Sequence, residues 1–271
     1  DTVEALNFGT MLYGLDQVYL HYTRRLAHLD PDVVVVGLLA RPSDALSNYF
    51  VPLRRPKERN MPYFKPRMYM RNGQLLVQPV PDKAVYRQLL VDPTLMARVI
   101  ANDRYGYNFT EYRQCNLGPL SAAICGLWNQ GRRVRDRLAE HPADPPLLGL
   151  RQRLLHELTA AVRQRGGHVL FVVLPDLTTT TPGGWRALLP DRHGDLVSAL
   201  RAEGLPVLDA RAALRASGHR LSRLYHADRV HYSPLGNRVI AAAVAERLAR
   251  LLGETATRTP RPAPGADRPP S

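Results

Sequence analysis

Lysine and cysteine are scarce in this chain of 271 residues, and no long apolar run is present. The lysines are Lys57, Lys65 and Lys83, so the formal charge of +13 comes almost entirely from arginine. A membrane-spanning helix needs about 18 or more consecutive apolar residues, and no segment approaches that length. The chain opens without a signal peptide, but at Asp1 rather than Met. Membrane anchoring upstream of Asp1 therefore stays open, and so does the choice between a cytoplasmic and an exported protein.

The two cysteines, Cys115 and Cys125, exclude a disulfide-rich scaffold and match no common metal-binding spacing. They either form one disulfide in an oxidising compartment or remain two buried thiols. No other residue pattern indicates a metal site or a cofactor.

Arginine is spread along the chain rather than gathered in one segment. One explanation is a base-composition bias in the gene, and the other is a surface that attracts anionic polymers or lipids. No nucleic-acid-binding motif accompanies the charge, so we do not expect a nucleic-acid partner.

Apolar runs alternate with amphipathic segments, which predicts an α/β fold with a mainly parallel sheet. Continuous runs of β-branched and other apolar residues, such as 32–39, are typical of parallel strands covered on both faces. Asn72-Gly73 joins two short apolar runs and predicts a hairpin over 67–79. The predicted strands are 3–8, 32–39, 168–174 and 205–208, and the main predicted helices are 12–29, 147–167 and 234–252.

We expect one domain over residues 1–253, with an insert at about 40–81 and a variable helical region at about 84–146. Residues 254–271 are rich in proline and arginine, which predicts a disordered tail. Ligands of parallel α/β sheets bind at the carboxyl ends of the strands. The loops after Phe8, Leu39 and Leu174, together with 226–233, are therefore the candidate site.

The segment "HADRVHYSPLGN" places Asp228 and His231 three residues apart. A histidine that acts as a general base needs one ring nitrogen held by an acceptor, so that the other is free to take a proton. Ser233 is a suitable N-cap and Pro234 suits the first turn of a helix, which would fix the loop that carries the pair. The alternative is a loop in which Asp228 satisfies backbone amides and His231 is a surface residue.

Several segments resemble the SGNH (GDSL-like) hydrolase family. "DRVHYSPLGNRVIAAAVAERL" is similar to the family's last block, in which the Asp-x-x-His pair supplies two members of a serine esterase triad. "LNFGTMLYGLDQVYL" resembles the second block, and "PDVVVVGLL" resembles the strand before the third. "FKPRMYMRNGQLLVQPVP" is similar to a Lys-Pro-Arg hairpin insert found in one bacterial subgroup. The resemblance implies a three-layer, flavodoxin-like parallel sheet with helices on both faces.

The chain also departs from the family pattern. The first block, a strand that ends in Gly-Asp-Ser, is absent. Leu12 stands where the second block usually has a glycine whose amide binds the oxyanion. Pro42, Ser43 and Asp44 lie near the usual place of an asparagine donor, and Asn48 comes later.

A missing first strand would leave two buried strands without a neighbour. Each unpaired buried backbone group costs about 1–3 kcal/mol, and several of them would exceed a typical stability of about 5–15 kcal/mol. We therefore expect the nucleophile and its strand to lie upstream of Asp1.

The resemblance implies hydrolysis of a small-molecule or glycan acyl ester, with His231 as base, Asp228 as its orienting carboxylate and no cofactor. The alternative is an inactive SGNH-like domain that binds a carbohydrate or a cell-envelope partner.

Overall fold

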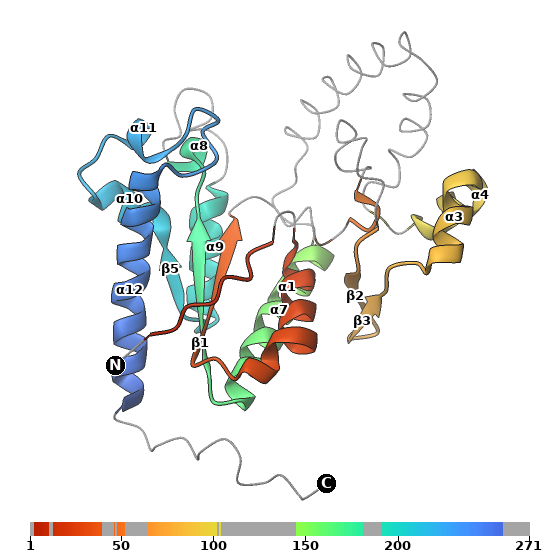
Figure 1. Cartoon of the computed structure of the whole chain (residues 1–271), viewed down its shortest axis with the longest axis horizontal. Coiled ribbons are helices and arrows are strands. Elements are labelled where there is room, and N and C mark those ends of the chain that lie inside the picture. Colours follow the sequence, from red (N-terminus) through yellow and green to blue (C-terminus); the bar gives the residue numbers. More distant parts are fainter. Residues whose placement is uncertain are drawn as a thin grey trace, which may run out of the picture. The chain divides into compact units, whose positions relative to one another are not determined.

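The structure is a computed structural model that forms two compact units. One unit holds residues 1–25 and 43–157, and the other holds 26–42 and 158–271. No helix in the described part of the chain is both long and apolar enough to cross a membrane. The described residues, drawn as coloured elements in Figure 1, are 3–10, 13–39, 46, 48–51, 64–101, 103, 145–180 and 191–256.

The second unit is built around a parallel sheet of three strands, β1 (Val33–Leu39), β4 (His168–Leu174) and β5 (Val207–Asp209), in the order β1-β4-β5. All seven residues of β1 pair with β4, from Val33 opposite His168 to Leu39 opposite Leu174. The predicted strands at 32–39, 168–174 and 205–208 are therefore confirmed within one or two residues. A parallel sheet flanked by helices confirms the predicted α/β fold class.

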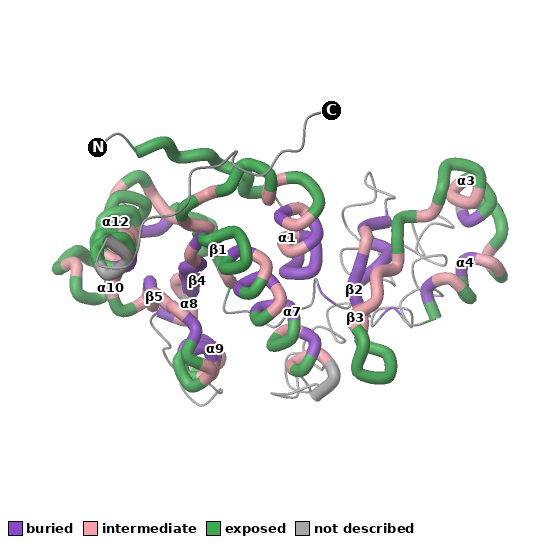
Figure 2. Tube along the Cα trace, turned by 90° about the horizontal axis from the view of Figure 1, so that it is seen from below, coloured by how far each residue is buried: buried purple, intermediate pink, exposed green. Residues whose placement is uncertain are grey.

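Helices cover both faces of this sheet. Figure 2 shows α9 (Arg192–Ala202) and α12 (Pro234–Ala256) on opposite sides of the strands. Leu170 and Val172 of β4 are buried against an apolar row of α12 that includes Val244 and Leu251. Full burial of such a side chain contributes about 1.5–3 kcal/mol, so this contact is what holds α12, and the loop before it, on the sheet.

The first unit has its own core and its own hairpin. Strands β2 (Arg67–Arg71) and β3 (Gln74–Gln78) pair antiparallel around Asn72 and Gly73, which both have positive φ as a type I′ turn requires. The predicted hairpin is thus confirmed. The described helices that lie wholly within this unit are α1 (Leu15–His21), α3 (Lys83–Val91) and α4 (Pro93–Val99). The buried core side chains are Tyr49, Phe50, Phe64, Leu89, Met96 and Ile100.

Two of the sequence motifs meet inside the first unit. Asp16, from "YGLDQ", is fully buried and accepts the backbone N–H of Met68, and its Oδ2 lies 3.6 Å from Nζ of Lys65 in the Lys-Pro-Arg motif. Burial raises the pKa of Asp16, and the positive charge of Lys65 opposes that shift. The Lys-Pro-Arg segment therefore joins the hairpin to α1.

The predicted strand at 3–8 is wrong. Residues 3–10 form no strand, and Val3 and Leu6 are largely exposed. Their hydrogen bonds are local, such as Gly9 N–H to Asn7 Oδ1 at 2.9 Å. Apolar residues become a strand only where another strand supplies hydrogen-bond partners, and no described strand pairs with this segment.

The predicted long helices are confirmed with changed ends. The helix expected over 12–29 begins at Leu15 as α1 and continues as a π turn and a 3₁₀ turn to Leu29. Helix α7 (Pro145–Gln164) replaces the expected 147–167. Helix α12 runs four residues beyond the expected end at Leu252, to Ala256. The tail after that residue, and most of the 84–146 region, lie outside the described residues.

Gly236, in the first turn of α12, sits where a side chain has no room. A Cβ added there would lie 2.1 Å from the carbonyl oxygen of Leu224, at the end of α11 (Leu221–Leu224). We expect Gly236→Ala to lower the free energy of unfolding by about 1–3 kcal/mol or more, because backbone must move. Gly253→Ala in the same helix meets no atom within 4 Å and should stabilise by about 0.5–1 kcal/mol. Urea unfolding of both variants checks this, and equal stabilities would contradict the packing described.

Candidate functional site

Asp228 and His231 lie in a short loop between α11 and α12. Tyr225 and Tyr232 form an antiparallel bridge at its base, and the N–H of His226 donates to the carbonyl of His231 at 2.8 Å. Inside the loop, Arg229 has a φ of 60°. A non-glycine residue in this left-handed region costs on the order of 1–3 kcal/mol, so the loop conformation is maintained by the bonds around it.

The loop is fastened to the carboxyl end of β4. The hydroxyl of Tyr232 donates a hydrogen bond to the carbonyl of Pro175, the first residue after β4. The N–H of Leu177 donates to the carbonyl of Arg229 at 3.0 Å. Two of the predicted site loops, the one after Leu174 and the one at 226–233, therefore do come together.

The structure brings the side chains of Asp228 and His231 into direct contact. Oδ2 of Asp228 lies 2.5 Å from Nδ1 of His231. Oδ1 of Asp228 accepts the backbone N–H groups of Val230 at 2.9 Å and of His231 at 3.0 Å. One carboxylate thus holds both the imidazole ring and the backbone that carries it.

These three hydrogen bonds hold the pKa of the Asp228 carboxyl well below its usual range. The bond from the His231 ring is the largest cause, followed by the two backbone N–H groups. The carboxylate is therefore ionised throughout the neutral pH range. An ionised acceptor at Nδ1 favours the tautomer with the proton on Nδ1, which leaves Nε2 with a free lone pair.

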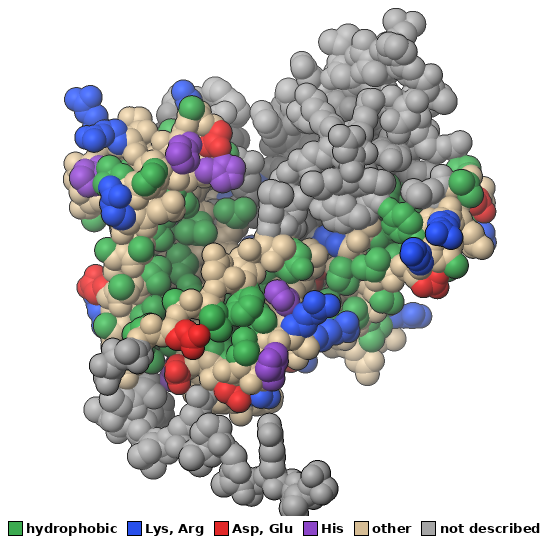
Figure 3. All heavy atoms as spheres, in the orientation of Figure 1, with side chains coloured by type: hydrophobic (Ala, Val, Ile, Leu, Met, Phe, Trp, Pro, Cys, Tyr) green, Lys and Arg blue, Asp and Glu red, His purple; other side chains and the backbone are tan. Residues whose placement is uncertain are grey.

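The pair lies on an exposed surface. The side chain of His231 is 77% exposed and that of Asp228 is 47% exposed. Figure 3 shows histidine and arginine side chains gathered over α11 and α10 (Ala210–Ala216), with a carboxylate among them. In the part of the chain that the structure describes, Nε2 of His231 has no hydrogen-bond partner. This nitrogen is available to a group that the described residues do not supply.

Ser233 is the N-cap of α12, as predicted. Its Oγ accepts the N–H of Gly236 at 3.2 Å and donates to the carbonyl of Arg223 at 2.7 Å. A hydroxyl engaged in this way is not a nucleophile. Ser198, Ser217 and Ser222, the other described serines, make no contact with His231.

Asn48 is not an oxyanion donor. It is buried, and its side-chain N–H groups donate to the carbonyl of Phe50 at 2.8 Å and to Oδ2 of Asp103 at 3.1 Å. The same Asp103 oxygen accepts the N–H of Tyr49 at 2.6 Å. Asn48 is therefore part of the framework of the first unit.

Several residues considered from the sequence lie outside the described residues. These are Leu12, the loop 41–44 with its Pro42, Ser43 and Asp44, and both Cys115 and Cys125. The expectation that Nε2 of His231 faces Leu12 and the 41–44 loop stays a prediction.

Sequence reasoning missed a second histidine–carboxylate pair. Nε2 of the buried His193 lies 2.6 Å from Oδ1 of Asp209, which also caps α10 by accepting the N–H of Arg211 at 2.9 Å. The two residues are 16 positions apart, and no local motif indicates the contact. No three histidine, cysteine, aspartate or glutamate side chains of the described residues come together as a metal site.

Comparison with protein families places this geometry in context. Residues 134–266, just under half of the chain and including Asp228 and His231, match the family described as "SGNH hydrolase-like domain, acetyltransferase AlgX". Neither the curated proteins nor the solved structures gave a match.

The hydrogen bonds to Asp228 predict a measurable acid–base signature. His231→Ala removes the ring bond but leaves the two amide bonds, so the pKa of Asp228 should rise and still stay below the ordinary 3.8. Carboxyl ¹³C NMR titration measures it, with the exposed His226→Ala in the same loop as the unchanged control. Because the folded-state pKa of Asp228 is depressed, its contribution to the free energy of unfolding is present above pH 3.8. That contribution is lost as the pH falls through the lower pKa of the folded state. An unchanged Asp228 titration in His231→Ala would contradict the contact.

Proposed function

Because residues 134–266 match the SGNH hydrolase-like family, we propose that Asp228 and His231 are the carboxylate and general base of a serine acyl-ester hydrolase. The observation that carries this proposal is the contact of Asp228 Oδ2 with Nδ1 of His231, an exposed side chain whose Nε2 has no partner among the described residues. The same carboxylate also binds two backbone amides, which hold the ring at a defined place.

In the proposed reaction, Nε2 of His231 takes the proton of a serine hydroxyl while the serine oxygen attacks the acyl carbon. Asp228 stays ionised and stabilises the imidazolium that forms. The tetrahedral intermediate collapses, the alcohol leaves with the proton from Nε2, and an acyl-serine remains. Water then attacks the acyl-serine and gives a proton to Nε2, and Nε2 passes that proton to the serine oxygen as the acid leaves. No metal is needed for any of these steps.

The serine belongs to a segment outside the described residues, which we place before Asp1. One feature of β1 supports a further element on the sheet. Val35 and Leu39 lie on the face that α12 covers over β4, and they are 45% and 66% exposed. Parallel strands are normally covered on both faces, so this apolar face fits a segment that the described residues do not include.

The acceptor of the acyl group decides between hydrolysis and transfer. Both reactions pass through the same acyl-serine, and an alcohol in place of water gives transfer. The matched family carries the description acetyltransferase, which favours a sugar hydroxyl or another alcohol as a competing acceptor. The proposed substrates are therefore small-molecule or glycan esters.

A second candidate function is an inactive SGNH-like domain that binds a carbohydrate or an envelope partner. The high exposure of His231 favours it, because a catalytic base usually works in a site from which water is excluded. The two candidates differ in whether removal of the imidazole affects chemistry or only binding.

The activity of the full-length protein tests the proposed base. His231→Ala should lower kcat for an acyl ester by about 10⁶-fold, because the base is lost, and Asp228→Asn by about 10⁴-fold, because an amide sets the wrong tautomer. His226→Ala, an exposed histidine of the same loop, is the matched control and should keep full activity. Circular dichroism confirms the fold of each variant. Full activity in His231→Ala would end the proposal.

A fluorophosphonate probe tests the position of the nucleophile. Residues 1–271 alone should gain no covalent adduct, because we place the nucleophile on a segment outside them. The full-length protein should gain one adduct, and His231→Ala should prevent it. Intact-mass spectrometry reads the result. A stoichiometric adduct on a serine within residues 1–271 would show that the nucleophile has been placed wrongly, and an unlabelled full-length protein would favour the inactive domain.

A further inference from the structure

The loop that carries Asp228 and His231 rests on a group of buried hydroxyls at the end of β4. Both Tyr225 and Tyr232 direct their hydroxyls at the carbonyl of Pro175, Tyr225 from 3.2 Å. The two rings lie against each other with centroids 5.1 Å apart. We call Pro175, Tyr225 and Tyr232 the tyrosine seat, because it lies under the base of the loop at the Tyr225–Tyr232 bridge.

Thr180 connects the tyrosine seat to the short helix α8 (Leu177–Thr180). Its hydroxyl is fully buried, lies 2.7 Å from the hydroxyl of Tyr225, and donates to the carbonyl of Asp176 at 2.8 Å. Each hydroxyl has one proton. If Thr180 donates to Asp176, Tyr225 donates to Thr180 and Tyr232 donates to Pro175, then all three protons are used in a single consistent arrangement.

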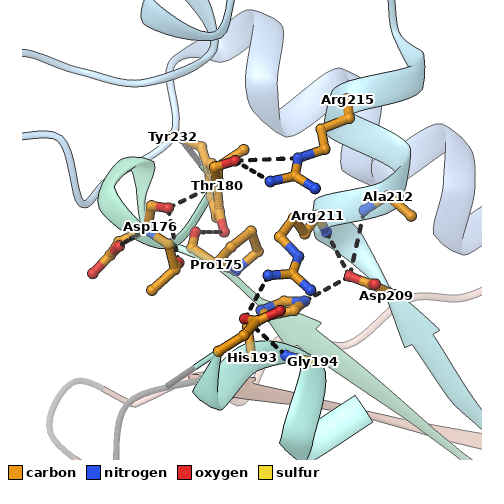
Figure 4. A network of polar contacts seen from close by, with 12 residues as sticks. Pro175, Asp176, Thr180, His193, Gly194, Asp209, Arg211, Ala212, Arg215 and Tyr232 are labelled. Atoms are coloured by element: carbon orange, nitrogen blue, oxygen red, sulfur yellow. Dashed lines mark hydrogen bonds and ion pairs between the residues drawn. The ribbon is translucent and has the colours of Figure 1, made fainter. Parts of the chain in front are cut away.

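None of these three hydroxyls donates to the backbone carbonyl of Thr180, at the C-terminal end of α8, so that oxygen needs another hydrogen-bond donor. Arg215 supplies both donors: its Nε lies 3.1 Å and its Nη2 2.5 Å from that oxygen. Helix C-terminal carbonyls commonly accept hydrogen bonds from arginine, and bonds from a charged donor are stronger than neutral ones. Figure 4 shows Arg215 reaching toward Thr180 on one side, with Pro175 and Tyr232 close to Thr180.

Arg215 can act in this way because its own helix is fixed at the opposite end. Asp209 caps α10 and also binds the buried His193 of α9. Arg211, in the first turn of α10, donates to Oδ1 of Asp191 at 2.7 Å. The contacts drawn in the lower half of Figure 4 thus attach the start of α10 to α9, and Arg215 attaches its last turn to α8.

We infer that Arg215 is a positioning residue for the Asp228–His231 pair, acting through Thr180 and the tyrosine seat. Among the described residues, the hydrogen bonds of Arg215 go to the carbonyl of Thr180 and not to Asp228 or His231. Arg215 holds α8 in place. Helix α8 in turn positions the loop through the Thr180–Tyr225 hydroxyl contact and the Leu177–Arg229 backbone bond. The role of Arg215 in catalysis rests on the proposed function, but its effect on the loop does not.

The experiment compares Arg215→Met with Arg223→Gln in the full-length protein. Both variants lose one arginine charge near the loop, but the Arg223 guanidinium makes no hydrogen bond or ion pair with a described residue. Hydrogen exchange measures the exchange rates of the Val230 and His231 amides, which donate hydrogen bonds to Asp228. A ¹³C NMR titration of Asp228 is the second readout, because a general loss of stability would not change the pKa of a carboxyl in the folded state.

In Arg215→Met we expect the Val230 and His231 amides to exchange about tenfold faster or more, since a hydrogen bond to a charged group is lost. Exchange within β4 should not change, and the pKa of Asp228 should move up toward 3.8. Arg223→Gln should show neither effect. Arg215→Lys, which keeps the charge and can donate one hydrogen bond to Thr180, should fall between.

Loop amides and an Asp228 titration that are the same in Arg215→Met and Arg223→Gln would overturn the inference. If Arg215→Met does not fold, Arg215→Lys decides. Faster amide exchange that is confined to the loop supports the positioning role. Amide exchange that is equally faster across the whole sheet would show that Arg215 only stabilises the fold in general. Neither result depends on catalytic activity, so failure of the proposed function would be seen separately.

Discussion

The Asp228 carboxylate makes three hydrogen bonds, and the geometry of the candidate site depends on them. Oδ1 binds two backbone amides and Oδ2 binds the imidazole of His231. The loop contains Arg229 in a left-handed conformation, which is unfavourable for a side chain with a Cβ. A single ionised group thus offsets the cost of the loop and orients the ring that the loop presents. Without the carboxylate, the imidazole would lose the hydrogen bond that orients it, and the Val230 and His231 amides would lose their acceptor.

In the proposed site, the two side chains that would do the chemistry are exposed and the hydroxyl groups beneath them are buried. The proposed catalytic pair is on the surface, whereas the groups that support it are not: Thr180 is fully buried and Tyr225 is 5% exposed. Burial raises the pKa of both Tyr225 and Tyr232, so their hydroxyls remain protonated donors at any physiological pH. A rigid base under a solvent-facing histidine suits a site that is completed by another segment.

Much of the fold was predictable from sequence because its signals are local. The apolar runs at 32–39 and 168–174 became neighbouring parallel strands, Asn72-Gly73 became the hairpin turn, and Ser233 became the cap of α12. A strand was predicted at 3–8 and did not form. Strand formation depends on a partner strand, and the run itself does not contain that information.

The same distinction holds for the candidate site. The three-residue spacing of Asp228 and His231 predicted their contact. Nothing local indicated that Arg215 would donate to Thr180, 35 positions away, or that His193 would bind Asp209. Asn48 could be considered as a donor from its position in the sequence, but its partner Asp103 lies 55 positions further on. Contacts of this kind follow from packing and appear only in the folded chain.

The central claim is that Asp228 makes Nε2 of His231 the nitrogen that accepts a proton. Long-range ¹H–¹⁵N correlation spectra of the neutral imidazole test this directly because they assign the proton to one ring nitrogen. The account predicts a protonated Nδ1 and an unprotonated Nε2 for His231. A spectrum in which Nε2 carries the proton and Nδ1 does not would contradict it.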